Sequence, residues 1–365
     1  MKIAHVDAET GFSGGEVQVF TLIEGLRRAG WSNVLFAPPG SRCQARAKEL
    51  GVEFGAVVMR NDLDAAAVLE LKRGFERSGA ALAHLHTGRA TWLGGWAARI
   101  AGIPALTTRR MDREVKPGMR TKIVHETLTR RTVAISPAVA ECLRAGGVPS
   151  ERVRTIASAV DPAQLRAKRG RDDVRRELGV ADERVVLLTS GALVRRKGLD
   201  VLLDALAQAA FASAAWSLWI AGDGAEREAL EQRARELTLE GNVHFLGRRD
   251  DIPELLNACD AVVMPSRREG LGVAALEAMA ACRAVVATKV GGLASTVVDG
   301  ETGLLVAADD ASALALALRR VVADAALRKR LGEAGRARLS QGFLAEQMVD
   351  AYAALYREVL AEAQR

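Results

Sequence analysis

Residues 265–280 read PSRREGLGVAALEAMA, and this stretch decides how the second half of the chain is interpreted. A short aliphatic run ends at Pro265, where a loop that carries Glu269 begins. Two glycines follow, and after them an alanine-rich helix carries Glu277. A carboxylate at the start of a helix is ordinarily a cap, but capping accounts for one glutamate and leaves the spacing of both with the glycines unexplained. The stretch predicts a strand that turns through a glycine loop into a helix.

The rest of the chain repeats this strand-to-helix pattern. Aliphatic runs without in/out alternation, typical of parallel strands buried on both faces, alternate with alanine- and leucine-rich helical segments such as Gly15–Ala29 and Leu199–Ala210. The βαβα pattern occurs twice and predicts an α/β protein of two doubly wound, Rossmann-like domains that face each other across a cleft. The predicted strands are Lys2–Asp7, Asn33–Ala37, Gly55–Val58, Leu82–His86, Ala105–Thr108, Thr132–Ile135, Arg184–Thr189, Trp216–Ala221, Val243–Leu246, Ala261–Pro265, Ala284–Thr288 and Gly303–Val306.

The domain boundary is expected in a polar segment near the middle of the chain. A chain of 365 residues is too long for one ordinary core. Residues 166–178, RAKRGRDDVRREL, make a poor core and a good linker into a surface helix. The last helix, residues 344–365, follows the second sheet and is expected to pack across the domain junction. The predicted domains are residues 1–160, residues 161–343 and this terminal helix.

Composition and local sequence exclude several classes of protein. The four cysteines form no CxxC pair and no metal-type cluster with histidine, which favours buried free thiols. The start, MKIAHVDAE, lacks the apolar segment of a secretory signal and indicates a cytoplasmic protein. Residues 205–222 carry no charge, but Gln208 and many alanines make them weakly apolar. We therefore expect a helix end, a turn near Ser213 and a strand there, and no membrane span.

Basic residues gather in one segment. The formal net charge is +6, and the segment from Arg109 to Arg131 holds eight Arg or Lys against three Asp or Glu. An acidic partner is therefore plausible. Nucleic acid is disfavoured because no aromatic residues are interleaved for stacking on bases. An anionic membrane surface, a phosphorylated ligand and plain solvated surface remain open alternatives.

Three glycine-containing loops follow predicted strands and suit phosphate groups. Gly14 and Gly15 precede the first helix, where the backbone can approach a ligand and the helix start favours an anion. Residues 190–198, SGALVRRKG, contain Gly191 and then Arg195, Arg196 and Lys197, whose cations can hold a diphosphate and offset its charge as it leaves. Gly222 stands at the end of the next strand. Each loop could instead be a plain turn or a solvated basic surface.

The opening stretch offers the strongest chemical signal. Backbone N–H groups at the helix start, formed by Gly270, Leu271, Gly272 and Val273, would suit a diphosphate. Glu277, on the second turn, lies near enough to hold two hydroxyls of a ribose. Glu269 precedes the glycines and would touch a sugar attached to that diphosphate.

These residues resemble a known enzyme family. EGLGVAALE, residues 269–277, is similar to the E-x7-E motif of retaining glycosyltransferases with the GT-B fold, notably family 4. The likeness covers nearly the whole chain and includes VDP at 160–162, AGDG at 221–224, VHFLGR at 243–248 and DGETGLLV at 299–306. By this resemblance the N-terminal domain binds the acceptor and the C-terminal domain binds the nucleotide-sugar. It implies these roles: Glu277 for the ribose, Glu269 for the donor sugar, Arg196 and Lys197 for the diphosphate, and the backbone around Phe245, Leu246 and Arg248 for the base.

The chain departs from the family pattern at two places. Gly191-Ala192-Leu193 stands where many members have Gly-Arg-Leu, so Arg195 or Arg196 would serve instead. Arg109 and Arg110 follow Thr108 where many members carry a sugar-contacting histidine in a T-x-H stretch. We therefore take Arg109, Arg110 and His86 as candidate substrate contacts, which leaves the sugar undefined.

The resemblance implies transfer of a sugar, with retention of configuration, from a nucleotide diphosphate to a hydroxyl acceptor. Glu269, Lys197 and Arg196 are the candidate catalytic residues, UDP is the favoured nucleotide, and no metal or other cofactor is expected. The acceptor is expected to be a lipid-linked or phosphorylated glycan at the inner membrane face, in the synthesis of cell-envelope glycoconjugates. The enzyme itself is expected to be cytoplasmic or peripheral on that face. The alternatives are a nucleotide-sugar epimerase or hydrolase on the same scaffold, and a non-catalytic two-domain anion-binding protein.

Overall fold

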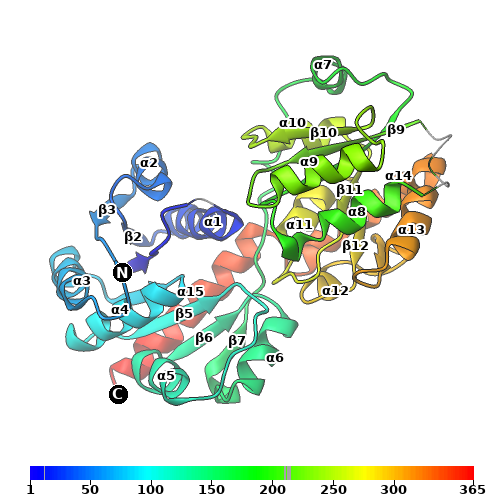
Figure 1. The fold of residues 1–365 in the computed structure, drawn as a ribbon. Coiled ribbons are helices and arrows are strands. Elements are labelled where there is room, and N and C mark those ends of the chain that lie inside the picture. Colours follow the sequence, from blue (N-terminus) through cyan, green and yellow to red (C-terminus); the bar gives the residue numbers. More distant parts are fainter. Residues whose placement is uncertain (12, 209–210, 212–214) are drawn as a thin grey trace. The chain divides into compact units, whose positions relative to one another are not determined.

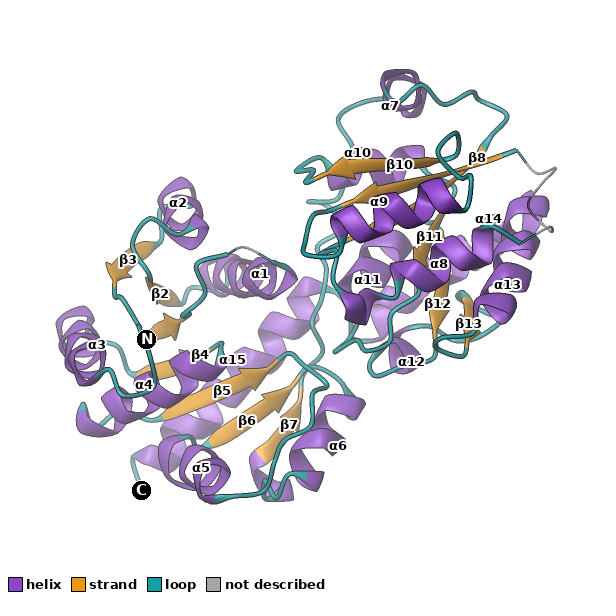
Figure 2. Ribbon diagram, viewed as in Figure 1, coloured by secondary structure: helices purple, strands orange, loops and turns teal. Residues whose placement is uncertain are grey.

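The chain forms two compact units, each built on one parallel β-sheet (Figures 1 and 2). This computed structural model describes residues 1–11, 13–208, 211 and 215–365. The first unit comprises Met1–Ala159 and Ala345–Arg365, and the second comprises Val160–Leu344. The prediction of two doubly wound α/β domains is confirmed. The predicted helix end at Ala210 and the predicted turn near Ser213 lie outside the described residues.

The first unit has a seven-stranded sheet in the order β3-β2-β1-β4-β5-β6-β7. Its strands are β1 (Lys2–Val6), β2 (Ser32–Ala37), β3 (Glu53–Ala56), β4 (Leu82–Leu85), β5 (Ala105–Arg109), β6 (Arg131–Ala134) and β7 (Val153–Thr155). Its helices are α1 (Gly14–Arg28), α2 (Arg42–Glu49), α3 (Ala65–Ser78), α4 (Gly88–Ile100), α5 (Met119–Lys122), a π-helix (Ile123–Leu128), α6 (Pro137–Ala145), a 3-10 turn (Ser150–Arg152) and α15 (Ala345–Ala363). The strand order reverses between β1 and β4, where His5 lies opposite His84.

The second unit has a six-stranded sheet in the order β10-β9-β8-β11-β12-β13. Its strands are β8 (Val185–Ser190), β9 (Trp216–Ala221), β10 (Val243–Gly247), β11 (Ala261–Met264), β12 (Ala284–Thr288) and β13 (Leu304–Val306). Its helices are α7 (Arg171–Glu177), α8 (Leu199–Leu206), α9 (Arg227–Glu236), α10 (Ile252–Ala258), α11 (Val273–Ala280), α12 (Leu293–Thr296), α13 (Ala311–Ala323) and α14 (Ala325–Arg338), with 3-10 turns at Arg195–Lys197 and Leu339–Gln341. The order reverses between β8 and β11. Ligands of doubly wound sheets bind at such a switch point.

The terminal helix α15 belongs to the first unit. Its apolar face packs on α1 and the first sheet, with Tyr352 and Tyr356 buried beside Trp31. The carboxylate of Glu358 accepts hydrogen bonds from Arg131 at 2.7 Å and from Arg154 at 3.2 Å. The first unit is therefore built from two distant parts of the sequence.

Three local features differ from the predictions. The strand β7 was not predicted, because three residues among charged neighbours give little periodic signal. β3 ends at Ala56, earlier than the predicted Gly55–Val58. Helix α7, expected on the surface, buries Arg175, whose Nη2 lies 2.6 Å from Asp260. Within the described residues no helix is both long and apolar enough to span a bilayer.

Candidate functional site

The loops after β8 and β11 meet at the switch point of the second sheet. The loop after β8 carries Lys197 and ends at Gly198, and the loop after β11 begins at Pro265. Arg267 N donates to the Arg196 carbonyl at 2.8 Å, which ties one loop to the other. A small pocket here is lined by both loops and by the end of β9: Thr189, Ser190, Gly191, Ala192, Leu193, Lys197, Leu199, Ile220, Met264, Pro265 and Ser266.

Glycines allow these loops to approach one another closely. A Cβ on Gly198 would lie 2.0 Å from the Pro265 carbonyl oxygen, and this glycine has φ +65°. A Cβ on Gly222, which follows β9, would lie 1.8 Å from the Gly191 carbonyl oxygen. No side chain fits at either position without a backbone shift. Gly198 and Gly222 therefore bring three strand ends together, and of these two only Gly222 was predicted as a binding residue.

The predicted glutamate of the loop is in contact with the predicted cations. Lys197 Nζ lies 2.6 Å from Glu269 Oε2, and the Arg196 guanidinium lies 3.9 Å from the same oxygen. Ser266 Oγ donates to Glu269 at 3.3 Å. Since Lys197 and Glu269 are both largely shielded from solvent, their interaction is stronger than that of a surface ion pair. Ser266 was missed from the sequence, since a serine in a loop carries no specific signal.

The second predicted glutamate lies on α11. Gly272 caps this helix with φ +90°, and Glu277 follows on its second turn. Burial raises the pKa of the Glu277 carboxyl from 4.5 to about 7, while the charge of Lys197 opposes this shift. Lys197 therefore acts electrostatically on both glutamates. The first N–H groups of α11 have no acceptor within the helix, and they begin beside the loop of Glu269.

The residues predicted for the base lie at the same edge of the second sheet but farther along it. Phe245 and Leu246 belong to β10, which is the edge strand beside β9. Gly222 N donates to the Gly247 carbonyl at 2.7 Å, so the loop after β9 links these residues to the glycine-rich region. Arg248 follows directly. The predicted residues of the second half are thus arranged along one edge, from β10 to α11.

The predicted residues of the first half lie at the C-terminal edge of the first sheet. Gly14 and Gly15 form the first residues of α1. A Cβ on Gly15 would lie 3.7 Å from Arg110 Cδ. Arg110 also contacts the other predicted residue, with Nη2 3.2 Å from His86 Nδ1. Arg109 points elsewhere and donates to the Arg113 carbonyl.

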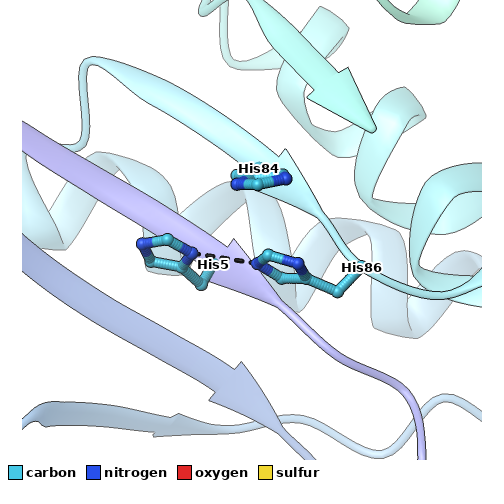
Figure 3. A group of neighbouring side chains, drawn as sticks. All are labelled: His5, His84 and His86. Carbon is cyan, nitrogen blue, oxygen red and sulfur yellow. Dashed lines mark hydrogen bonds between the residues drawn. The ribbon is translucent and has the colours of Figure 1, made fainter. Parts of the chain in front are cut away.

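Three histidines cluster beneath Arg110 and offer one nitrogen each within 4.8 Å of one another (Figure 3). They are His5, His84 and His86, and all three are buried. His5 was not identified from the sequence. Its position near the end of β1, opposite His84, would have indicated it if the strand register had been known. Each of the six ring nitrogens has a hydrogen-bond partner in the protein, which leaves none directed at a metal ion.

Comparison with known proteins identifies the family. The model "Glycosyltransferase Family 4" matches residues 12–164, and the model "Glycosyl transferases group 1" matches residues 170–338. The lipopolysaccharide core biosynthesis glycosyltransferase LpsE of Rhizobium meliloti is 38% identical over 178 residues, which are 49% of this chain and 51% of LpsE. The lipopolysaccharide core biosynthesis mannosyltransferase LpsB of the same organism is 31% identical over 215 residues, 56% of this chain and 60% of LpsB. The chain thus spans about half the length of the curated relatives it matches.

Solved structures agree in fold. The crystal structure of Anabaena Alr3699/HepE in complex with UDP and glucose superposes with a TM-score of 0.87 at 23% identity, and covers 98% of this chain and 100% of that one. The two family models together extend over both units of the chain. The chain therefore belongs to the glycosyltransferases of the family 4 type and has the GT-B fold.

Proposed function

We propose that this protein is a retaining glycosyltransferase that moves a sugar from a UDP-sugar to a hydroxyl of a lipid-linked or phosphorylated glycan. One observation carries the proposal: Lys197 and Glu269 are paired at the switch point of the second sheet, and the pKa of Glu277 is raised beside them. The relatives named for lipopolysaccharide core biosynthesis and the structures solved with UDP support the class of donor and product.

The residues of the second unit divide the binding of the donor among them. Glu277 would hold the ribose hydroxyls with its carboxylate, and the base would lie along Phe245–Arg248. Lys197 and Arg196 would bind the diphosphate and stabilise the charge that grows on it as the glycosidic bond breaks. Because these cations supply the positive charge that a divalent ion otherwise provides, we propose that the reaction needs no metal.

Retention of configuration would follow from a front-face reaction. The leaving phosphate would accept the proton of the attacking hydroxyl, and that hydroxyl oxygen would bond to the anomeric carbon on the face that the phosphate leaves. Glu269, held by Lys197 and Ser266, would contact the sugar. NMR of the first product formed tests this: retention of the anomeric configuration supports the proposal, and inversion contradicts it.

The donor assignment is tested by thermal shift with UDP, GDP, ADP and their sugar conjugates, for the wild type and for Glu277→Ala. A ligand that binds the native state stabilises it by about 2.7 kcal/mol at a hundredfold excess over Kd. We expect a shift with UDP or a UDP-sugar that is lost in the variant. A shift with another nucleotide would reassign the donor, and no shift with any of them would contradict the proposal.

Two rivals are distinguished by their products. A hydrolase or an epimerase on this scaffold would release free sugar or an isomerised nucleotide-sugar without an acceptor. A non-catalytic anion-binding protein would bind the nucleotide and form no product. Transfer that requires an added acceptor excludes both.

A surface of the first unit supports a membrane-bound acceptor. Leu63 is 91% exposed and Met119 is 75% exposed. Arg120, which follows Met119, lies 2.7 Å from Asp62, which precedes Leu63, and 4.8 Å from the centroid of the Trp92 ring. These contacts connect the segments that carry Leu63 and Met119. Exposed Arg113, Lys116 and Lys122 belong to the same basic segment. Apolar side chains together with cations suit an anionic bilayer, so we propose peripheral association with the cytoplasmic face of the membrane.

Vesicle sedimentation tests this surface. Replacement of Leu63 and Met119 by serine, and separately of Arg113 and Lys116, should each reduce binding to vesicles that contain anionic lipid. Lys329→Ser, an exposed cation of the second unit, is the matched control. Equal binding by all of these proteins would contradict membrane association through this surface.

A further inference from the structure

A series of buried hydrogen bonds in the first unit ends at Arg110. His86 Nδ1 lies 3.2 Å from Arg110 Nη2, and His86 Nε2 lies 2.9 Å from His5 Nδ1. His5 Nε2 lies 3.0 Å from Asn33 Oδ1. The rings of His5 and His86 are nearly parallel, with centroids 5.2 Å apart, and the hydrogen bond joins them edge to edge (Figure 3). This series of hydrogen bonds therefore runs from the interior of the sheet to a guanidinium at its edge.

The donor and the acceptor of every hydrogen bond in this series can be assigned. Asn33 Nδ2 donates to the Trp31 carbonyl at 3.2 Å, so its Oδ1 is the atom that accepts from His5 Nε2–H. Burial lowers the pKa of His5 to about 4 and that of His86 well below its usual value, so both rings are neutral near pH 7. A neutral ring has one donor and one acceptor. His5 Nδ1 therefore accepts from His86 Nε2–H, and His86 Nδ1 is left to accept from Arg110.

His84, the third histidine, packs against this series of hydrogen-bonded residues and is itself held by hydrogen bonds. His84 Nδ1 lies 2.7 Å from the Tyr356 hydroxyl, and its Nε2 lies 2.7 Å from Thr108 Oγ1. The Tyr352 hydroxyl lies 2.9 Å from the same threonine oxygen. The ring of His84 lies 4.0 Å from that of His86, centroid to centroid. Helix α15 thus helps to fix the orientation of the histidines.

Arg110 itself uses two of its five N–H donors inside the protein. Nη1 donates to the His86 carbonyl at 3.3 Å and Nη2 donates to His86 Nδ1. Its Nε is buried and has no hydrogen-bond partner among the described residues. Within that same part of the chain, Arg110 forms no ion pair with a carboxylate. The charge of Asp7 acts on it from farther away, while Asp7 Oδ1 accepts from Glu9 N at 2.9 Å.

The buried Nε of Arg110 carries a free-energy cost because it has no acceptor, and the remaining unused N–H groups are available to a ligand that supplies acceptors. A planar guanidinium recognises carboxylate and phosphate oxygens best, since both match its fork of donors. The neighbouring backbone leaves room, because Gly15 presents no side chain toward Arg110 Cδ. We infer that Arg110 binds an oxyanion of a substrate, either a phosphate or a sugar carboxylate, and that His86 and His5 are positioning residues that hold its guanidinium.

This inference rests on the proposed function, since that function makes the ligand a transferase substrate, but its test does not need activity. Binding of inorganic phosphate, glucuronate and neutral glucose is measured by calorimetry on the full chain. All proteins carry Arg195→Ala, Arg196→Ala and Lys197→Ala, which removes the three cations of the loop after β8. The variants compared are Arg110→Gln, His86→Leu and His86→Asn. Arg77→Gln is the matched control, since Arg77 is an exposed cation of the same unit.

We expect Arg110→Gln to weaken binding of phosphate or glucuronate at least tenfold and to leave glucose unchanged. Whichever anion is affected identifies the source of the oxyanion. His86→Leu should weaken it similarly, and His86→Asn, which keeps an acceptor near the Nδ1 position, should recover part of the affinity. Equal affinities in Arg110→Gln and its parent, or an equal loss in Arg77→Gln, would overturn the inference. UDP binding by the unmodified chain is measured separately, so failure of the proposed function is recognised independently.

Discussion

At the scale of single residues, the second-unit site places one lysine between two carboxyl groups of different character. Glu269 is in direct contact with Lys197 and accepts a further hydrogen bond from Ser266. Glu277 makes no such contact with any residue that the structure describes, and burial is the main cause of its raised pKa. The same cation therefore pairs directly with one carboxylate and only moderates the pKa of the other. An incoming diphosphate would compete with Glu269 for Lys197.

The raised pKa of Glu277 predicts a pH-dependent stability. Between about pH 4.5 and 7 the folded state keeps a proton that the unfolded chain releases, so this carboxyl lowers stability as pH rises through the window, and the loss is complete above pH 7. Glu277→Gln should approach the wild type below pH 4.5 and exceed it by roughly 3 kcal/mol at pH 8. Denaturant unfolding as a function of pH measures this difference.

Glu240→Gln, at an exposed position of the same unit, is the control and should follow the wild type at every pH. A constant difference between Glu277→Gln and the wild type across the range would contradict the assignment. The same variant should bind UDP more weakly, because an amide holds two hydroxyls less well than a carboxylate does. Stability gained with binding lost is expected where a functional site is strained.

At the scale of elements, the site depends on three loops that touch through glycines. The loops after β8, β9 and β11 meet because Gly198 and Gly222 have no Cβ. The helix α11 then starts from a left-handed glycine, which directs its N-terminus to the same edge. Cations on one loop, glutamates on another and free N–H groups at a helix start are thereby collected from separate segments.

Gly222→Ala should disturb this arrangement more than an ordinary glycine substitution. Its Cβ would lie 1.8 Å from a backbone oxygen, so the loops must separate, at a cost of about 2 kcal/mol. Gly241→Ala, whose Cβ would meet nothing within 4 Å, should change stability by less than about 0.5 kcal/mol. Thermal unfolding compares the two, and equal melting temperatures would show that the close approach is not maintained in solution.

The sequence predicted most of these elements and few of their contacts. Buried parallel strands are recognised because they are continuous aliphatic runs, and all twelve predicted strands overlap observed ones. The family resemblance assigned Lys197 and Glu269 separate roles in donor binding, but it did not predict that they pair. Their distance depends on which strands are neighbours, and local sequence does not contain that information. The hydrogen-bonded histidines next to Arg110 were missed for the same reason, since these histidines come from different strands.

At the scale of the whole molecule, the first unit is completed by a helix from the far end of the sequence. Each large apolar side chain that is fully buried contributes roughly 1.5–3 kcal/mol, and a domain is stable by only about 5–15 kcal/mol in total. Helix α15 buries several such side chains, among them Met348, Leu355 and Tyr356. Its contribution is therefore comparable to the whole stability of the unit.

Fragments test this organisation. Residues 160–344 should fold alone and unfold cooperatively, because that unit is continuous in sequence. Residues 1–159 should lack a cooperative transition by circular dichroism until a peptide of residues 345–365 is added. Cooperative unfolding of 1–159 alone would show that α15 is dispensable. Residues 345–365 can be predicted from the sequence as a helix, but the surface against which this helix packs cannot.

The discontinuity of the first unit has a consequence for biosynthesis. A ribosome delivers residues 1–159 before the second unit, yet the segment that closes their core emerges after that unit. The second unit, complete at residue 344, can reach its native state while the first still lacks a helix. The nascent chain would thus mature in the reverse of the order in which it is made, and the apolar surface that awaits α15 is where a chaperone would be needed.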